Sequence, residues 1–289
     1  MIGELIKYTI ETLENARNFA SSLEGTSVNP DVDRYLTGYR TYPSSAMGTM
    51  GMMFCDIATN GVIEQTARKN IGKTSSRIIL LTDITDDIID KGQASLEEKF
   101  RFLDGVNSNL FGTGIYSIHN VKEEAAYSLA RRLFTDFMSR DTHGVYNGIF
   151  DSLVGVIKLQ FTAEDPDVLI EIARKIGACC ADAAAVVTEL ETDSTYPVMR
   201  NAARKMGEYC EFLDNWYELK NDLQEGVNTF PTVVIRKEGN RPSVRNHVKT
   251  VCLSEAERAF ESGYHGLDRN GKEIYRAMKL MIDCKYRIM

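Results

Sequence analysis

The segment RIILLTDITDDIIDKG, residues Arg77–Gly92, places four aspartates within eight positions of an otherwise apolar run. On a helix that turns by about 100° per residue, Asp83, Asp86, Asp87 and Asp90 fall on one stripe. The isoleucines and leucines of the segment spread around nearly the whole circumference, a pattern typical of a buried helix. Because burial of unpaired carboxylates is unfavourable, we expect this stripe to bind cations or to line a wet cavity.

This first acidic segment predicts a magnesium site. Carboxylates three and four residues apart present their oxygens about one helical turn apart, which suits Mg²⁺ ions that keep some water and share a phosphate ligand. The alternative is an exposed polar face paired with lysines of a neighbouring helix, although the isoleucines leave little room for one. A calcium loop counted from Asp83 does not fit, since its sixth position is not glycine and its twelfth is not glutamate.

A second acidic segment lies in RNAARKMGEYCEFLDNWYELKNDLQEG, residues Arg200–Gly226. Asp214, Glu218 and Asp222 share one helical stripe, and apolar residues occupy a separate arc, so this helix is expected to be amphipathic. Taken alone, its acidic face could be ordinary solvated surface. Together with the first segment it predicts a two-sided metal clamp for a diphosphate. The arginines upstream on the same stripe, which could take the remaining phosphate charge, are Arg200 and Arg204.

The remaining sequence predicts one all-helical domain over residues 1–289, with about ten or eleven helices punctuated by prolines. The run PTVVIRKEGNRP, residues 231–242, is interpreted as a loop or helix entry because one short strand cannot form a sheet. A formal net charge of -7 argues against a nucleic-acid-binding surface. Six cysteines without CxxC pairs or histidine ligands argue against a zinc site or a disulfide framework and favour a cytoplasmic setting. No transmembrane segment and no signal peptide are expected.

The two acidic segments together resemble a known family. TDDIID, residues Thr85–Asp90, resembles the DDxxD motif of class I isoprenoid synthases, which comprise trans-prenyltransferases and ionisation-type terpene synthases. The second segment keeps the i, i+4, i+8 spacing of the second metal-binding triad of terpene synthases. The likeness is closer to bacterial large-terpene synthases of the tetraprenyl-β-curcumene type, where Asp83 matches an aspartate ahead of the first motif. Gly226 and Asn228 match the residues that trail the second motif.

This resemblance implies an antiparallel helical bundle with a central apolar cavity, three Mg²⁺ ions and an allylic prenyl diphosphate as substrate. The metals would draw the diphosphate away, and the resulting carbocation would be cyclised or quenched while water is excluded. The implied metal ligands are Asp83, Asp86, Asp87, Asp90, Asp214, Glu218 and Asp222, of which Asp86, Asp87 and Asp90 are the catalytic set. The candidate substrate-binding residues are Arg200, Arg204, Tyr217, Lys285 and Tyr286.

Two departures from the family pattern favour a terpene synthase over a chain-elongating enzyme. The segment GYRTYP, residues 38–43, lacks the lysine of the GKxxRP-like segment of prenyltransferases, and Asp214 is followed by Asn215 rather than by a second aspartate. The terminal CKYRIM is only loosely similar to the Arg-Tyr pair of terpene synthases. A prenyltransferase that elongates or joins prenyl chains head-to-head remains the main alternative. An all-α nucleotide pyrophosphohydrolase and a non-catalytic helical protein remain open too, and a homodimer is compatible with the sequence.

Residues that could line the cavity also have a simpler interpretation. AMGTMGMMFCD, residues Ala46–Asp56, mixes small residues with methionines and could either open space for a prenyl tail or pack closely against a neighbouring helix. Trp216 lies opposite Asp214 on the helical wheel and is expected in the core, whereas Tyr217 borders the acidic stripe and is expected at the cavity rim.

Overall fold

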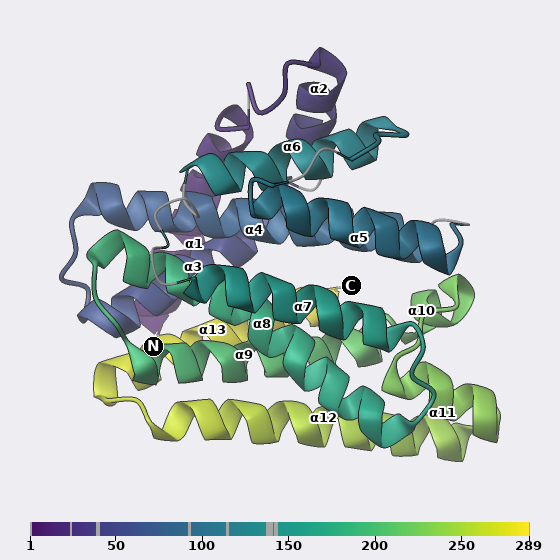
Figure 1. Ribbon diagram of the computed structural model, residues 1–289. Helices are drawn as coiled ribbons and strands as arrows, with labels where there is room; N and C mark the ends of the chain where they lie inside the picture. The colour runs from purple at the N-terminus through teal and green to yellow at the C-terminus, as the bar shows by residue number, and fades with distance from the viewer. Residues whose placement is uncertain are drawn as a thin grey trace. The chain divides into compact units, whose positions relative to one another are not determined.

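The structure is a computed structural model that describes residues 2–23, 25–38, 41–91, 94–113, 116–136, 141 and 144–288. Within these ranges it contains thirteen α-helices and no strand, which confirms the all-α prediction with somewhat more helices than expected (Figure 1). The helices are α1 (Ile2–Ser21), α2 (Pro30–Gly38), α3 (Thr41–Thr59), α4 (Gln65–Lys91), α5 (Leu96–Leu110), α6 (Val121–Asp136), α7 (Val145–Gln160), α8 (Pro166–Thr192), α9 (Pro197–Tyr217), α10 (Leu219–Glu225), α11 (Phe230–Glu238), α12 (Pro242–His265) and α13 (Arg269–Ile288).

The ends of the helices follow from local sequence. Pro30, Pro166, Pro197 and Pro242 are each the first residue of a helix, where the missing N–H would have had no partner within the helix. Helix α5 begins with a complete capping box, in which Ser95 and the residue three positions later satisfy each other's backbone N–H groups. The prolines therefore mark helix starts, as the sequence predicts.

The chain divides into two compact units. Unit 1 comprises residues 1–151 and 183–196, and unit 2 comprises residues 152–182 and 197–289, so that two boundaries fall inside α7 and α8 and the third lies just before α9. The first acidic segment belongs to unit 1 and the second to unit 2. The expectation of a single domain over residues 1–289 stays a prediction.

In unit 1, α3 packs along α4, and α1 packs against α3. The glycines of α3 face the serines of α4 at very short range: a Cβ atom added to Gly48 would lie 1.9 Å from Ser76 Oγ, and one added to Gly51 would lie 2.1 Å from Ser75 Oγ. The small residues of α3 thus let two helices approach closely, and they leave no open space at these positions. Of the two interpretations of this segment, close packing is the one that the structure supports.

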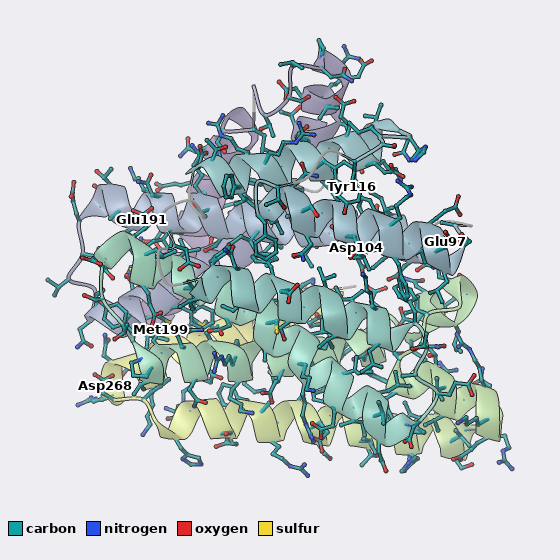
Figure 2. The ribbon with its side chains drawn as sticks, in the orientation of Figure 1. Glu97, Asp104, Tyr116, Glu191, Met199 and Asp268 are labelled. Carbon is teal, nitrogen blue, oxygen red and sulfur yellow. The ribbon has the colours of Figure 1, made fainter. Side chains whose placement is uncertain are left out.

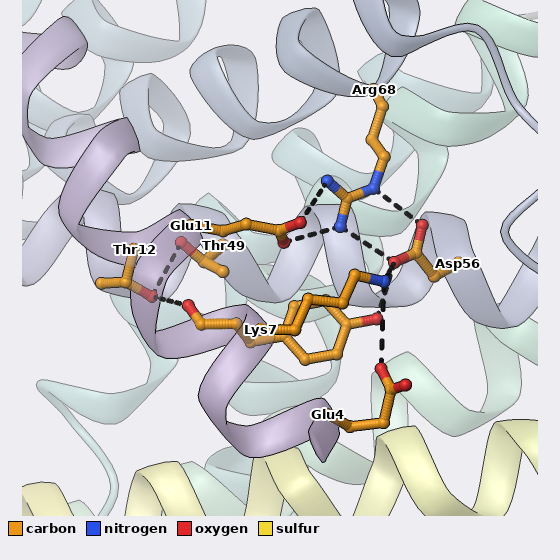
Figure 3. A network of polar contacts seen from close by, with 8 residues as sticks. Glu4, Lys7, Glu11, Thr12, Thr49, Asp56 and Arg68 are labelled. Carbon is orange, nitrogen blue, oxygen red and sulfur yellow. Dashed lines mark hydrogen bonds and ion pairs between the residues drawn. The ribbon is translucent and has the colours of Figure 1, made fainter.

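A polar network fixes the start of α4 to α1 and α3 (Figure 3). Asp56, only 2% exposed, accepts hydrogen bonds from Arg68 at 2.8 and 2.9 Å and from the Tyr8 hydroxyl at 2.6 Å. Arg68 also donates to both carboxylate oxygens of Glu11, at 3.0 and 2.7 Å, and Lys7 lies 3.1 Å from Asp56. Burial raises the pKa of Asp56, but the hydrogen bonds from Arg68 and Tyr8 outweigh it and hold that pKa below its usual value.

In unit 2, α9 packs along α12, and α11 packs on both. A compact apolar cluster is formed by Leu169 and Ile172 of α8 together with Phe230 and Val248 of the helices that follow. Helices α8 and α9 cross at backbone contact, because a Cβ atom added to Gly207 would lie 1.9 Å from the carbonyl oxygen of Gly177. Helix α9, which carries Asp214, is therefore held by α12 and, at this crossing, by α8.

Candidate functional site

The first acidic segment occupies about the last four turns of α4. Its core-facing residues are Leu80, Leu81, Ile84 and Ile89, all buried. Asp83, Asp87 and Asp90 are partly buried, and Asp86 is exposed. The expectation of a helix buried on every side is wrong for the side that carries these carboxylates. Their common side is accessible to water, which is what a carboxylate stripe that binds ions requires.

The nearest arginine upstream of this stripe is already paired with a carboxylate. Arg77 is buried, donates to Asp136 at 2.8 Å and donates to the backbone oxygen of Ser22 at 3.0 Å. It therefore links α4 to α6 and to the end of α1. Its role in unit 1 is structural, since its partners hold three helices together.

The second acidic segment spans a break between two helices. A continuous helix over residues 200–226 is expected from the sequence, but α9 ends at Tyr217 and α10 begins at Leu219. Glu218 stands at the break, with φ -86° and ψ -1°, and its carboxylate accepts a hydrogen bond from the side-chain amide of Asn221. Asp214 is exposed, and Glu218 and Asp222 are partly buried. The three acids thus lie on consecutive turns, with the change of helix at the middle one.

Apolar and capping contacts hold this broken segment in place. Leu219, Leu223 and Trp216 pack against the apolar cluster of unit 2, which confirms the core position predicted for the tryptophan. Gly226 ends α10 in the left-handed conformation, with φ 80°, and its N–H donates to the Asp222 carbonyl at 2.9 Å. Asn228 donates to the backbone oxygens of residues 161 and 163, both at 3.3 Å. The glycine and asparagine that trail the motif therefore have structural roles.

The end of α13 meets the second acidic segment. The Tyr286 hydroxyl donates to Asp214 Oδ1 at 2.7 Å, and the Tyr286 ring stacks on that of Tyr217 with centroids 5.2 Å apart and planes inclined by 17°. Lys285 Nζ lies 4.9 Å from the centroid of the Tyr286 ring. Burial and the neighbouring Asp214 raise the pKa of Tyr286 well above its usual value, so the hydroxyl stays protonated. Three of the five candidate substrate-binding residues therefore gather beside Asp214.

The other two candidates, Arg200 and Arg204, gather elsewhere. Both bind the buried carboxylate of Asp182 on α8: Arg200 at 2.7 Å to each oxygen, and Arg204 at 2.8 and 2.6 Å to Oδ2. With a rise of about 1.5 Å per residue, the Cα atom of Arg204 lies about 15 Å from that of Asp214 along the helix. A role of these arginines in binding substrate stays a prediction.

The roles of Asp182 and of the Asp56 network do not follow from the sequence, because their partners are distant in the chain. A signal exists for Asp182, which is a single acid in the apolar run ACCADAAAVV, residues 178–187. A charge on such a helix predicts a buried cationic partner, although the sequence does not say which one. The segment GYRTYP lies largely outside the described side chains, as do Ala46, Met47, His143 and Arg287.

An open depression of about 650 Å³ lies on unit 1 beside α5, and Figure 2 labels three of its lining residues, Glu97, Asp104 and Tyr116. It is lined by Leu96, Glu97, Phe100, Arg101, Asp104 and Tyr116. None of the predicted metal ligands borders it, so it is not the expected central cavity, which stays a prediction. No described helix is both long enough and apolar enough to cross a membrane.

The donor set suits a hard divalent cation. All seven predicted ligands are carboxylates, the oxygen donors that Mg²⁺ and Ca²⁺ prefer. Among the residues that the structure describes, no three histidine, cysteine, aspartate or glutamate side chains converge closely enough to hold an ion. Each acidic segment alone offers only part of a coordination shell, so a metal would need further oxygens from water, a phosphate or the other segment.

Comparison with known proteins finds its matches among solved structures. No protein-family model and no curated protein matches the sequence. Geranylgeranyl pyrophosphate synthetase from the archaeon Geoglobus acetivorans is similar over 96% of this chain and 98% of its own, with a TM-score of 0.64 and 10% identity. A geranylgeranyl pyrophosphate synthase from Corynebacterium glutamicum, complexed with isoprenyl diphosphate and magnesium, has a TM-score of 0.56 and 12% identity over 96% and 98% of the two chains. A single-residue variant of cucumene synthase has a TM-score of 0.57 and 11% identity over 96% of each chain.

Proposed function

From the premise that the chain has the fold of the isoprenoid synthase superfamily, we propose that it is a divalent-metal-dependent enzyme that acts on an allylic prenyl diphosphate. The observation that carries the proposal is the carboxylate stripe of α4, which stays outside the core while the opposite face of the helix is buried. A second set of carboxylates on α9 and α10 supports it. One of the similar structures is complexed with magnesium and isoprenyl diphosphate, which supports the choice of metal and ligand class.

In the proposed reaction the two acidic segments bind Mg²⁺ ions, three in number by resemblance to terpene synthases. Asp86, Asp87 and Asp90 act from α4 with Asp83 beside them, and the second acidic segment acts from α9 and α10. Bound magnesium would supply Lewis-acid neutralisation of the leaving diphosphate. The apolar residues of the fold would surround the prenyl chain and exclude water from the carbocation.

Two fates of the carbocation follow, and different observations favour them. Prenyl diphosphate synthases outnumber terpene synthases among the similar structures, which favours condensation with a second prenyl unit. Asn215, in place of a second aspartate after Asp214, favours cyclisation or quenching, including the large-terpene type of reaction. We place condensation first because the comparisons support it more broadly. The pyrophosphohydrolase and the non-catalytic interpretation gain no support from the fold.

The test is release of diphosphate. The full chain is incubated with Mg²⁺ and prenyl diphosphates of increasing chain length, with and without isopentenyl diphosphate, and products are analysed by mass. Asp86→Asn combined with Asp87→Asn should lower the rate by at least about 10²-fold, because the neutral amides bind Mg²⁺ weakly. Asp31→Asn, which alters an exposed pair with Arg34, should leave the rate unchanged.

The result decides both parts of the proposal. A product longer than the allylic substrate establishes condensation, and a hydrocarbon or alcohol of equal chain length establishes cyclisation or quenching. If no prenyl diphosphate releases diphosphate in the presence of metal, the proposed function is wrong.

A further inference from the structure

The hydrogen bond between Tyr286 and Asp214 joins a buried donor to an exposed acceptor. Tyr286 is 5% exposed and is fixed by its stacking on Tyr217, whereas Asp214 lies at the surface of α9. A phenol has one proton to donate, and here it goes to Oδ1 at 2.7 Å. The bond therefore sets the rotamer of the carboxylate and leaves Oδ2 available to another ligand.

A second tyrosine–aspartate hydrogen bond joins the same two helices and provides a comparison. Tyr209 on α9 donates to Asp283 on α13, and Lys279 lies 3.3 Å from the same carboxylate. The charge of Asp283 is thus balanced by a lysine. Within the described part of unit 2, Asp214 forms no ion pair, so the two carboxylates differ in their charged neighbours although each accepts from a tyrosine.

We propose that Tyr286 is a positioning residue for Asp214: its hydroxyl holds one carboxylate oxygen so that the other is aimed at a cation bound to the second acidic segment. This inference rests on the proposed function, because it assumes that the second acidic segment binds metal. Hydrogen bonds that orient metal-binding carboxylates restrict their rotation and raise affinity for the ion, and their loss typically weakens metal binding by about 10–100-fold. Tyr286 thereby couples the end of α13 to metal binding on α9.

The chain carries a reporter on the same helix, since Trp216 is its single tryptophan, lies two residues after Asp214 and packs against the apolar cluster of unit 2. Tryptophan fluorescence is followed while the full chain is titrated with Mg²⁺ in the presence of inorganic diphosphate. Tyr286→Phe keeps the ring and its stacking and removes only the hydroxyl. It should raise the Mg²⁺ concentration at half-maximal response by about 10–100-fold.

Tyr209→Phe is the matched control. It removes the same hydroxyl from a hydrogen bond between the same two helices, but at a carboxylate that Lys279 already balances. It should lower stability about as much as Tyr286→Phe while leaving the magnesium titration unchanged. Far-UV circular dichroism and urea unfolding of each variant establish that both are folded and measure that loss.

A double-mutant cycle gives a second, independent reading. Asp214→Asn keeps an oxygen that accepts from Tyr286 but lowers the affinity for a cation. If Tyr286 acts through Asp214, adding Tyr286→Phe to Asp214→Asn should weaken magnesium binding no further. Additive losses would show that the tyrosine acts on the ion by another route and would overturn the inference.

The outcomes separate this inference from the proposed function. If the wild type responds and Tyr286→Phe responds at the same magnesium concentration, the positioning role is wrong and the proposed function stands. If Tyr209→Phe weakens binding equally, the effect is general packing of α13 on α9, and the positioning role is again wrong. If the wild type shows no response to magnesium with diphosphate, the metal site and the positioning role are both wrong.

Discussion

Two glycine-to-alanine substitutions, one at the crossing of α8 and α9 and one in α7, should have opposite effects on stability. In Gly207→Ala the new Cβ atom would lie 1.9 Å from the carbonyl oxygen and 2.6 Å from the carbonyl carbon of Gly177. Contacts of a Cβ atom below 3.0 Å are essentially never observed, so the helices must separate by roughly 1 Å. Both partners are backbone, and no side chain can turn aside to relieve the contact.

The change in the free energy of unfolding that Gly207→Ala causes is the difference between two opposing effects. Overpacking of this kind typically costs about 1–3 kcal/mol. Alanine regains about 1 kcal/mol over glycine through its helix propensity. Gly207→Ala should therefore destabilise the chain by up to about 2 kcal/mol. Because Gly207 precedes Asp214 by two turns, the shift of α9 should also weaken the magnesium-dependent fluorescence response.

Gly155→Ala in α7 is the matched control, since a Cβ atom there meets nothing within 4 Å. It should stabilise the chain by up to about 1 kcal/mol, through propensity and a restricted unfolded state. Urea unfolding followed by circular dichroism gives both free energies from the midpoint and slope. If Gly207→Ala stabilises the chain as much as Gly155→Ala does, α8 and α9 do not cross at this glycine and the argument is refuted.

Three further predictions concern charge. Asp56→Ala should lower the free energy of unfolding by about 1.5–3 kcal/mol, because it removes the charged acceptor of Arg68 and Tyr8 while Glu11 still balances Arg68, and urea unfolding measures this loss. The folded-state pKa of Asp56 is depressed, so its contribution is present above the unfolded value of about 3.9 and disappears as pH falls through the folded value. As the pH is lowered through this range, the free energy of unfolding should therefore fall less steeply in Asp56→Asn than in the wild type. Equal slopes of the free energy against pH would contradict this prediction. Removal of metal with a chelator should abolish the response of Trp216 to diphosphate, and an unchanged response would place the anion on protein cations instead.

The features of this fold that can be predicted from the sequence are those that depend on the helical periodicity of nearby residues. The stripe of Asp83–Asp90 and the amphipathic character of α9 follow from a turn of about 100° per residue, and both are present. The β-branched run at residues 231–238 forms α11 because Val233, Val234 and Ile235 are buried against neighbouring helices, and burial outweighs propensity. Local pattern thus fixes helices wherever packing agrees with it.

The sequence alone does not show which residues that are distant in the chain contact one another. The glycines of α3 fit a cavity wall as well as a close helix contact, and only the position of Ser75 and Ser76 on α4 decides between them. The partners of Arg200 and Arg204 could not be deduced for the same reason, because Asp182 lies on another helix. The break between α9 and α10 at Glu218 is also not predictable from the sequence, since every residue around it is compatible with a helix.

The arginine pairs bear directly on how a diphosphate could be neutralised. Arg77 is engaged by Asp136, and both Arg200 and Arg204 are engaged by Asp182, so the arginines nearest to the two acidic segments in the sequence already balance carboxylates. Releasing one to a substrate would remove part of this balance, although Asp182 would keep the other arginine and Asp136 would keep Arg132, which lies 2.7 Å away. We therefore expect cations bound to the acidic segments to balance the charge of a leaving diphosphate, together with the candidate substrate-binding residue Lys285. The proposed prenyl diphosphate chemistry therefore predicts a requirement for metal in this chain.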